Sequence, residues 1–138
     1  MQRDNLLGVE RWIVRLKLAM ATAADAEEQP AFRAPYPLTI TAVRYIPETA
    51  ITADGTNYAT LSAQNKGTDG TGTDEIASFA FDTATTDDVA AMDEKALTLS
   101  GTPANLVLAA GDVVSVKKAI AGSGLALDGI VIFEVTPD

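Results

Sequence analysis

Apolar and polar residues alternate along the last third of the chain, and this pattern is the starting point for predicting the fold. A period of two predicts a β-strand, because successive side chains of a strand point to opposite sides. Residues 113–120 and 129–136 both alternate and carry many branched side chains, which suit a pleated sheet. The glycine-punctuated stretch between them predicts a wide loop or a short crossover rather than a two-residue hairpin. The positions expected to face the core in the first strand are Val114, Val116 and Ile120. The second strand has one side with Ile130, Ile132 and Glu134 and another with Val131, Phe133 and Val135.

The first twenty residues fit two patterns. Apolar side chains recur at helical spacings of three and four, but residues 12–20 also alternate strictly. The alternation leaves Arg11, Arg15 and Lys17 on one side, so we predict a strand from Glu10 to Met20. Its charges are typical of an edge strand protected against aggregation, and they also fit a docking arm for an acidic partner. The alanine-rich residues that follow are compatible with a short helical turn.

Prolines, glycines and aspartates divide the middle of the chain. Residues 27–37 contain three prolines, which remove backbone donors and fix extended geometry, so we predict an irregular connector or an exposed arm. Thr86, Asp87 and Asp88 fit the N-cap and first turn of a short helix near residues 86–92. Short strands are predicted at residues 38–46, 58–66, 76–81, 95–100 and 106–108.

About eight strands at short intervals predict an all-β fold, and we expect an antiparallel jelly-roll-like β-sandwich. The length of 138 residues fits one compact domain. Within it we expect an N-terminal strand and proline-rich arm over residues 1–37 and the β-sandwich over residues 38–138. Hydrophobic residues make up 47% of the chain, which is enough to build a core.

The composition excludes several classes of chemistry. The chain has no cysteine and no histidine, so disulfides, thiol nucleophiles and a Ser-His-Asp triad are impossible. A net charge of −9 disfavours a nucleic-acid partner, because such proteins normally present a basic face. No apolar run approaches the roughly 18 residues of a membrane span. We therefore expect neither a nucleic acid nor a membrane as partner.

Three motifs resemble functional sites, and each has a simpler interpretation. Asp87, Asp93 and Glu94 could mimic the carboxylate pair of a glycoside hydrolase, but acids commonly stabilise a helix start. The acids of residues 69–75 lack the spacing of an EF-hand calcium loop. The glycines of residues 121–124 lack the Lys-Ser/Thr ending of a phosphate-binding loop. We predict no catalytic residue, no cofactor site and no metal site.

The order of strands and turns between Pro37 and Val135 resembles that of a known family. The stretches concerned are "PLTITAVRYIPETAITADGTNYATLSAQNKG", "EIASFAF", "LTLSGTPANLVLAAGDVVSVKKA" and "GSGLALDGIVIFEV". Together they resemble the capsid decoration, or cement, proteins of tailed bacteriophages. Head-fibre and tail-fibre-associated β-domains of phages have similar "AGD" strands.

The resemblance implies a non-enzymatic structural virion protein that binds the outer surface of an assembled phage capsid and stabilises it by bridging neighbouring subunits. It implies the major capsid protein as partner, a homotrimer, and a place on the capsid exterior after synthesis in the host cytoplasm. The alternative is a phage head- or tail-fibre-associated carbohydrate-binding β-domain.

Candidate contact residues follow from side-chain type, because aromatic and arginine side chains dominate interface energetics. Trp12 also fits a core position, since a tryptophan has a large area to bury. The candidates for contact with the capsid or between subunits are Arg11, Trp12, Arg15, Lys17, Phe32, Arg33 and Tyr36.

Overall fold

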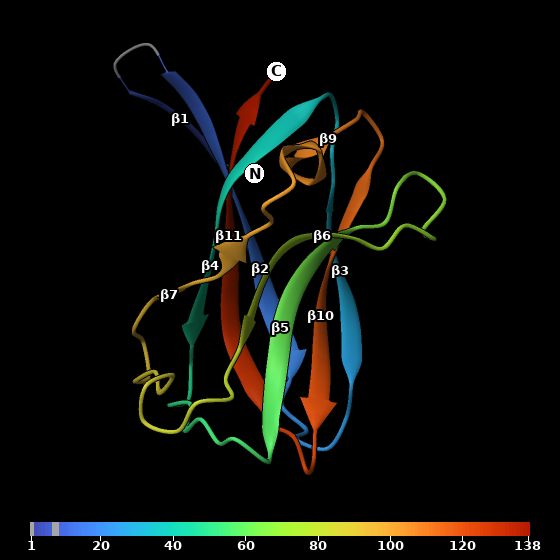
Figure 1. Cartoon of the computed structure of the whole chain (residues 1–138). Helices are drawn as coiled ribbons and strands as arrows, with labels where there is room; N and C mark the ends of the chain where they lie inside the picture. The colour runs from blue at the N-terminus through green and yellow to red at the C-terminus, as the bar shows by residue number, and fades with distance from the viewer. Residues whose placement is uncertain (1, 7–8) are drawn as a thin grey trace.

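Two antiparallel β-sheets pack face to face (Figure 1). The structure is a computed structural model, which describes the backbone of residues 2–6 and 9–138 and the side chains from residue 11 onward. Sheet A contains β1 (Gln2–Leu6), β2 (Val9–Met20), β4 (Leu38–Pro47), β7 (Lys95–Ala96), β9 (Val107–Leu108) and β11 (Leu127–Pro137). Its strand order is β1-β2-β11-β4-β7, and β9 pairs with the other end of β4.

Sheet B completes the sandwich. It contains β3 (Glu27–Arg33), β5 (Tyr58–Asn65), β6 (Asp74–Ala80), β8 (Thr98–Leu99) and β10 (Val113–Ala121), in the order β3-β10-β5-β6-β8. A short 3-10 helix, η1 (Pro103–Leu106), precedes β9. The order β2-β11-β4-β7 facing β3-β10-β5-β6 is that of a jelly roll, so the predicted fold class is confirmed.

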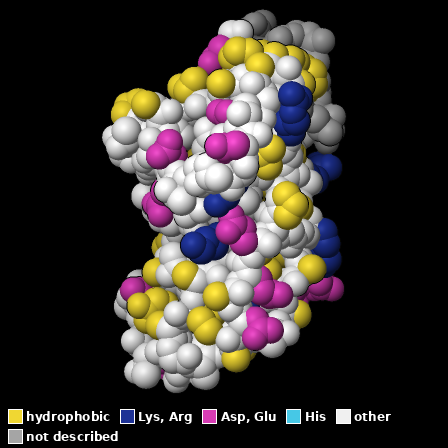
Figure 2. Space-filling view, turned by 90° about the vertical axis from the view of Figure 1, so that its right-hand side faces the viewer, with side chains coloured by type: hydrophobic (Ala, Val, Ile, Leu, Met, Phe, Trp, Pro, Cys, Tyr) yellow, Lys and Arg dark blue, Asp and Glu magenta, His cyan; other side chains and the backbone are white. Residues whose placement is uncertain are grey.

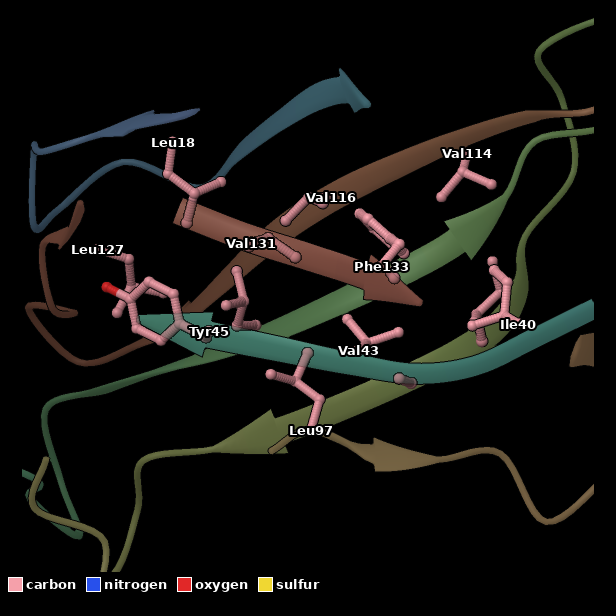
Figure 3. Close-up of a cluster of buried hydrophobic side chains, with 14 of the residues drawn as sticks. Leu18, Ile40, Val43, Tyr45, Leu97, Val114, Val116, Leu127, Val131 and Phe133 are labelled. Atoms are coloured by element: carbon pink, nitrogen blue, oxygen red, sulfur yellow. The ribbon is translucent and has the colours of Figure 1, made fainter. Parts of the chain in front are cut away.

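Side chains from both sheets fill the space between them (Figure 3). The predicted inward positions are confirmed at Val114 and Val116 of β10, both at most 1% exposed. In β11 the structure places Val131, Phe133 and Val135 in the core. Ile120 is only half-buried. The connection between β10 and β11 crosses from sheet B to sheet A, which confirms the prediction that these strands do not form a tight hairpin. Other core residues labelled in Figure 3 are Leu18, Ile40, Val43, Tyr45, Leu97 and Leu127.

The strand predicted from Glu10 to Met20 is confirmed as β2, but it is not an edge strand. It pairs with β1 on one side and with β11 on the other. The residues after it form a turn in which the Asp25 N–H donates to the Thr22 carbonyl at 3.3 Å, rather than the helical turn we expected.

The prediction of an irregular connector over residues 27–37 was wrong for its first part. Glu27–Arg33 forms β3, which pairs with β10 at the edge of sheet B. Pro30 lies opposite Ser115 where the register shifts by one residue, leaving Ala31 as the bulged residue. Proline is tolerated at a bulge on an edge strand, because its missing N–H breaks no essential ladder bond there.

The short helix predicted near residues 86–92 was also wrong. Within the described residues there is no α-helix, and this segment forms turns. The Asp87 N–H donates to the Thr83 carbonyl at 3.0 Å, but Thr85 has a φ of +64° and ends the helical geometry at once. Val89 instead forms an isolated β-bridge with Ile51.

Lys118 places a charged group inside one end of the sandwich. Its side chain is fully buried on the core-facing side of β10. The ammonium donates to the carbonyls of Thr22 at 2.6 Å, Leu125 at 3.2 Å and Met20 at 3.4 Å, and it lies 3.9 Å from a Glu27 carboxylate oxygen. Burial lowers its pKa, because desolvation disfavours the charged form. The ammonium thus joins the chain after β2 to the connection between β10 and β11.

We predict that Lys118→Met lowers the free energy of unfolding by about 3 kcal/mol, because the buried carbonyls lose their donor and Glu27 loses its counter-charge. Lys117→Met is the matched control, since Lys117 is a half-buried neighbour on the other side of the same strand. It should change stability by less than about 0.5 kcal/mol. Urea unfolding of the three proteins measures both effects, and equal losses in the two variants would contradict a clamping role for Lys118.

Candidate protein-docking face

The outer side of sheet A brings together side chains from its three central strands. In an antiparallel sheet, residues directly opposite each other lie on the same side. Arg15 of β2 and Arg44 of β4 both lie opposite Ile132 of β11, and Lys17 and Ile46 both lie opposite Ile130. We call the following set the docking face: Arg11, Ile13, Arg15, Lys17, Arg44, Ile46, Ile130, Ile132 and Glu134.

Four isoleucines form the apolar part of the docking face. Ile130 and Ile132 are successive outward residues of β11, Ile46 lies opposite Ile130, and Ile13 lies diagonally from Ile132. All four are half-buried, whereas the valines and phenylalanine on the other side of β11 are fully buried. Contiguous apolar residues on a surface mark interaction sites more often than scattered ones do.

Ion pairs surround these isoleucines. Glu134, whose side chain is 15% exposed, lies between Arg44 at 3.0 Å and Arg11 at 3.4 Å. Arg44 also contacts Glu94 at 2.8 Å, and hydrogen bonds to Glu94 and then Glu134 raise the pKa of its guanidinium. These contacts hold the Arg44 side chain in a fixed position beside Ile132 and leave it little freedom to bind a new partner.

Arg15 differs from the other cations of the docking face. It is exposed, and the described side chains form no ion pair with it. Lys17, by contrast, pairs with Glu48 at 2.8 Å, although both groups are more than half exposed. The docking face carries four cations and one carboxylate, with Glu48, Glu94 and Asp128 next to it, although the whole chain carries −9.

The predicted contact residues fall into two groups. Arg11, Arg15 and Lys17 lie together on the docking face. The aromatic residues instead pack beside the core. Trp12 and Tyr36 meet edge to face with ring centroids 6.0 Å apart, and Phe32 meets Phe133 at 5.3 Å. Arg33 is exposed on β3 of sheet B, opposite Val113.

Sequence reasoning missed the contribution of β4 and β11 to this face. The outward positions Ile130, Ile132 and Glu134 follow directly from the alternation of β11. They could have been identified by considering the solvent-facing side of this strand as a contact surface. Arg44 and Ile46 were harder to place, because the register of β4 shifts between Ile40 and Ala42.

The acidic motifs take part in local turns. Asp87 accepts a hydrogen bond from the Thr83 N–H at 2.9 Å, and Asp88 accepts one from the Ala53 N–H at 2.8 Å. Asp69 accepts one from the Thr71 N–H at 3.0 Å. The side chains from residue 11 onward contain no group of three metal-ligating residues arranged to hold an ion. The described helical segments include none that is long and apolar enough to cross a membrane.

Sheet B presents a different surface. Figure 2 views the sandwich from the edge where β3 lies in Figure 1, and acidic and basic side chains are interspersed over this edge. Here Glu28 accepts a hydrogen bond from the Ser115 hydroxyl at 2.8 Å and pairs with Lys66 at 3.1 Å. The Ser115 hydrogen bond is the main cause of the lowered pKa of Glu28. Glu28 and Lys66 therefore use their charges within sheet B.

Comparison with known proteins identifies no family for this chain. No protein-family model and no curated protein matches the chain. One similar solved structure is a CocE/NonD family hydrolase from Staphylococcus aureus, with a TM-score of 0.43 and 10% sequence identity. The match covers 92% of this chain but 34% of the hydrolase, so the chain spans about a third of that protein's length. A likeness at this level carries no argument about activity.

We predict that Glu134→Gln lowers the free energy of unfolding by about 1 kcal/mol, because this partly buried carboxylate bridges two arginines. Glu48→Gln, which removes the more exposed Lys17 ion pair, is the matched control and should cost less than about 0.5 kcal/mol. Chemical denaturation at low and at high salt measures both effects. A loss for Glu48→Gln as large as that for Glu134→Gln would show that burial does not distinguish these pairs.

Proposed function

We propose that the chain is a structural virion protein that binds the outer surface of an assembled phage capsid through the docking face. The observation that carries the proposal is the contiguous set of four isoleucines beside the exposed Arg15, on an otherwise acidic protein. The resemblance of residues 37–135 to capsid decoration proteins supplies the class of partner. The major capsid protein is then the molecule that the docking face contacts.

The physical arrangement of the docking face suits a protein partner. Specific interfaces combine an apolar centre with a polar rim, and arginine often contributes strongly to their binding energy. β11 is hydrogen-bonded on both sides, so Ile130 and Ile132 stand on a rigid strand and lose little conformational freedom on binding. Arg15 can pair with a carboxylate of the partner without first giving up an ion pair of its own.

Bridging of neighbouring subunits follows from several copies acting together. We propose that the protein acts as a homotrimer, so that the three docking faces contact adjacent capsid subunits. Once one copy is bound, the next contacts become intramolecular, which raises the overall affinity without any new kind of contact. Isolated capsid subunits offer one contact at a time and should bind weakly.

The carbohydrate-binding alternative receives less support from the surface. Such a function needs exposed aromatic rings on one sheet face. Within the described residues, every tryptophan, tyrosine and phenylalanine is buried or half-buried. Phe79, which is half-buried, is covered by the Lys95 ammonium at 4.0 Å from the ring centroid.

We predict that the protein sediments with mature shells of the phage that carries it and that isolated capsid subunits capture it at least about ten-fold more weakly, because only the shell allows several contacts at once. Co-sedimentation over a range of concentrations gives both affinities. Absence of binding to the shells would overturn the proposed function.

Variants of single cations locate the contact. Arg15→Glu should weaken shell binding by at least about ten-fold, because it places a carboxylate where the partner's acidic groups are expected. Lys117→Glu makes the same change of charge on the outer side of sheet B and should leave binding within about two-fold. Equal weakening in the two variants would mean that net charge, rather than the docking face, governs the interaction.

A further inference from the structure

A hollow lies at one end of the docking face, beside the loop that carries Met92. Its walls are mostly apolar and include Ile46, Pro47, Ile130 and Met92, and the ion pair of Lys17 with Glu48 also borders it. Its volume is about 240 Å³. The hollow therefore continues the isoleucine surface and adds depth to it.

The size of the hollow limits what it can hold. Pockets for drug-sized ligands and cofactors are larger, about 300–1,000 Å³, whereas a cavity of about 150 Å³ already holds benzene. A volume of about 240 Å³ suits one large apolar side chain. The backbone of Gly129 also lines this hollow, and its φ of +117° is a conformation that residues with a side chain rarely adopt.

Met92 combines an uncommon backbone conformation with an exposed apolar side chain at this hollow. Its φ is +66°, which is uncommon for a residue other than glycine, asparagine or aspartate. Its side chain is nonetheless 71% exposed, and its N–H donates to the Pro47 carbonyl at 2.8 Å. Within the described residues, the large apolar side chains in the exposed class are Met92 and Val107. Strained residues with exposed apolar groups are found at binding sites, where the strain is offset by the rest of the fold.

We propose that this hollow binds one large apolar side chain, aromatic or leucine, which an acidic segment of the capsid protein inserts between Met92 and Ile130. This inference rests on the proposed function, because it names the anchor of the same interface. The flexible thioether of Met92 suits contact with an aromatic ring. Lys17 borders the hollow but is paired with Glu48 there, and Arg15 is the next outward residue of β2. A carboxylate beside the inserted side chain can therefore pair with Arg15, which has no ion pair to the described side chains.

A peptide probe tests the hollow without any capsid. The probe is an acetylated pentapeptide with one phenylalanine flanked on each side by two acidic residues, and its control has alanine in place of phenylalanine. Methyl NMR shifts of Ile46, Met92 and Ile130 should saturate with the phenylalanine peptide at concentrations at least about ten-fold lower than with the alanine peptide. Equal responses to the two peptides, or shifts that lie elsewhere on the protein, would overturn the proposal.

Met92→Asp and Val107→Asp form a matched pair, because each introduces a charge at an exposed apolar residue. Aspartate tolerates the backbone conformation of residue 92, so the first variant should keep its thermal stability. It should abolish the difference between the two peptides and weaken shell binding at least about ten-fold, while Val107→Asp leaves both unchanged. Full shell binding by Met92→Asp would overturn the proposed anchor but leave the proposed function standing. If the wild-type chain binds the phenylalanine peptide but not the shells, the proposed function is overturned and the binding of an apolar side chain in the hollow stands.

Discussion

The pairing of β11 with β2 and β4 is the constraint on which most of the structure depends. Val131, Phe133 and Val135 fill the core on one side of this strand, and Ile130 and Ile132 stand on the other. A slip of one residue would exchange the two sides, placing Glu134 in the core and the phenylalanine in water. The same register therefore fixes the interior of the sandwich and the composition of its outer surface, so the docking face is as well determined as the core.

The fold was predictable from sequence wherever alternation was regular, as in β2, β10 and β11. The side to which each residue points was not predictable beyond a β-bulge, because nothing in the sequence identifies Thr41 and Ala31 as the extra residues of the bulges. Prolines also misled the prediction, since Pro30 is compatible with an edge strand that cannot be recognised as an edge without knowing its neighbours. Asp87 and Asp88, which were expected to cap a helix, instead accept hydrogen bonds from backbone N–H groups of turns and loops.

The candidate site was predictable to a similar degree. The cations of β2 stood out because they share one side of an alternating strand. The roles of Phe32 and Tyr36 could not be decided from sequence, because an aromatic residue near a proline can either hold the chain against the core or contact a partner. In the structure they form edge-to-face pairs with Phe133 and Trp12 and pack against the core. The partners from β4 became visible only with the register of sheet A.

Lys118 and Arg15 differ in whether their hydrogen-bond donors are already used within the chain. The buried ammonium of Lys118 has all its nearby acceptors within the chain, so its interactions were made on folding and are unavailable to a partner. Arg15 stands on a rigid strand beside Ile132 with its donors facing solvent. A carboxylate that meets it gains a charge-assisted hydrogen bond without breaking an existing pair, and the neighbouring isoleucines gain burial at the same time. Binding energy can therefore concentrate at this point of the surface even though the chain as a whole is strongly acidic.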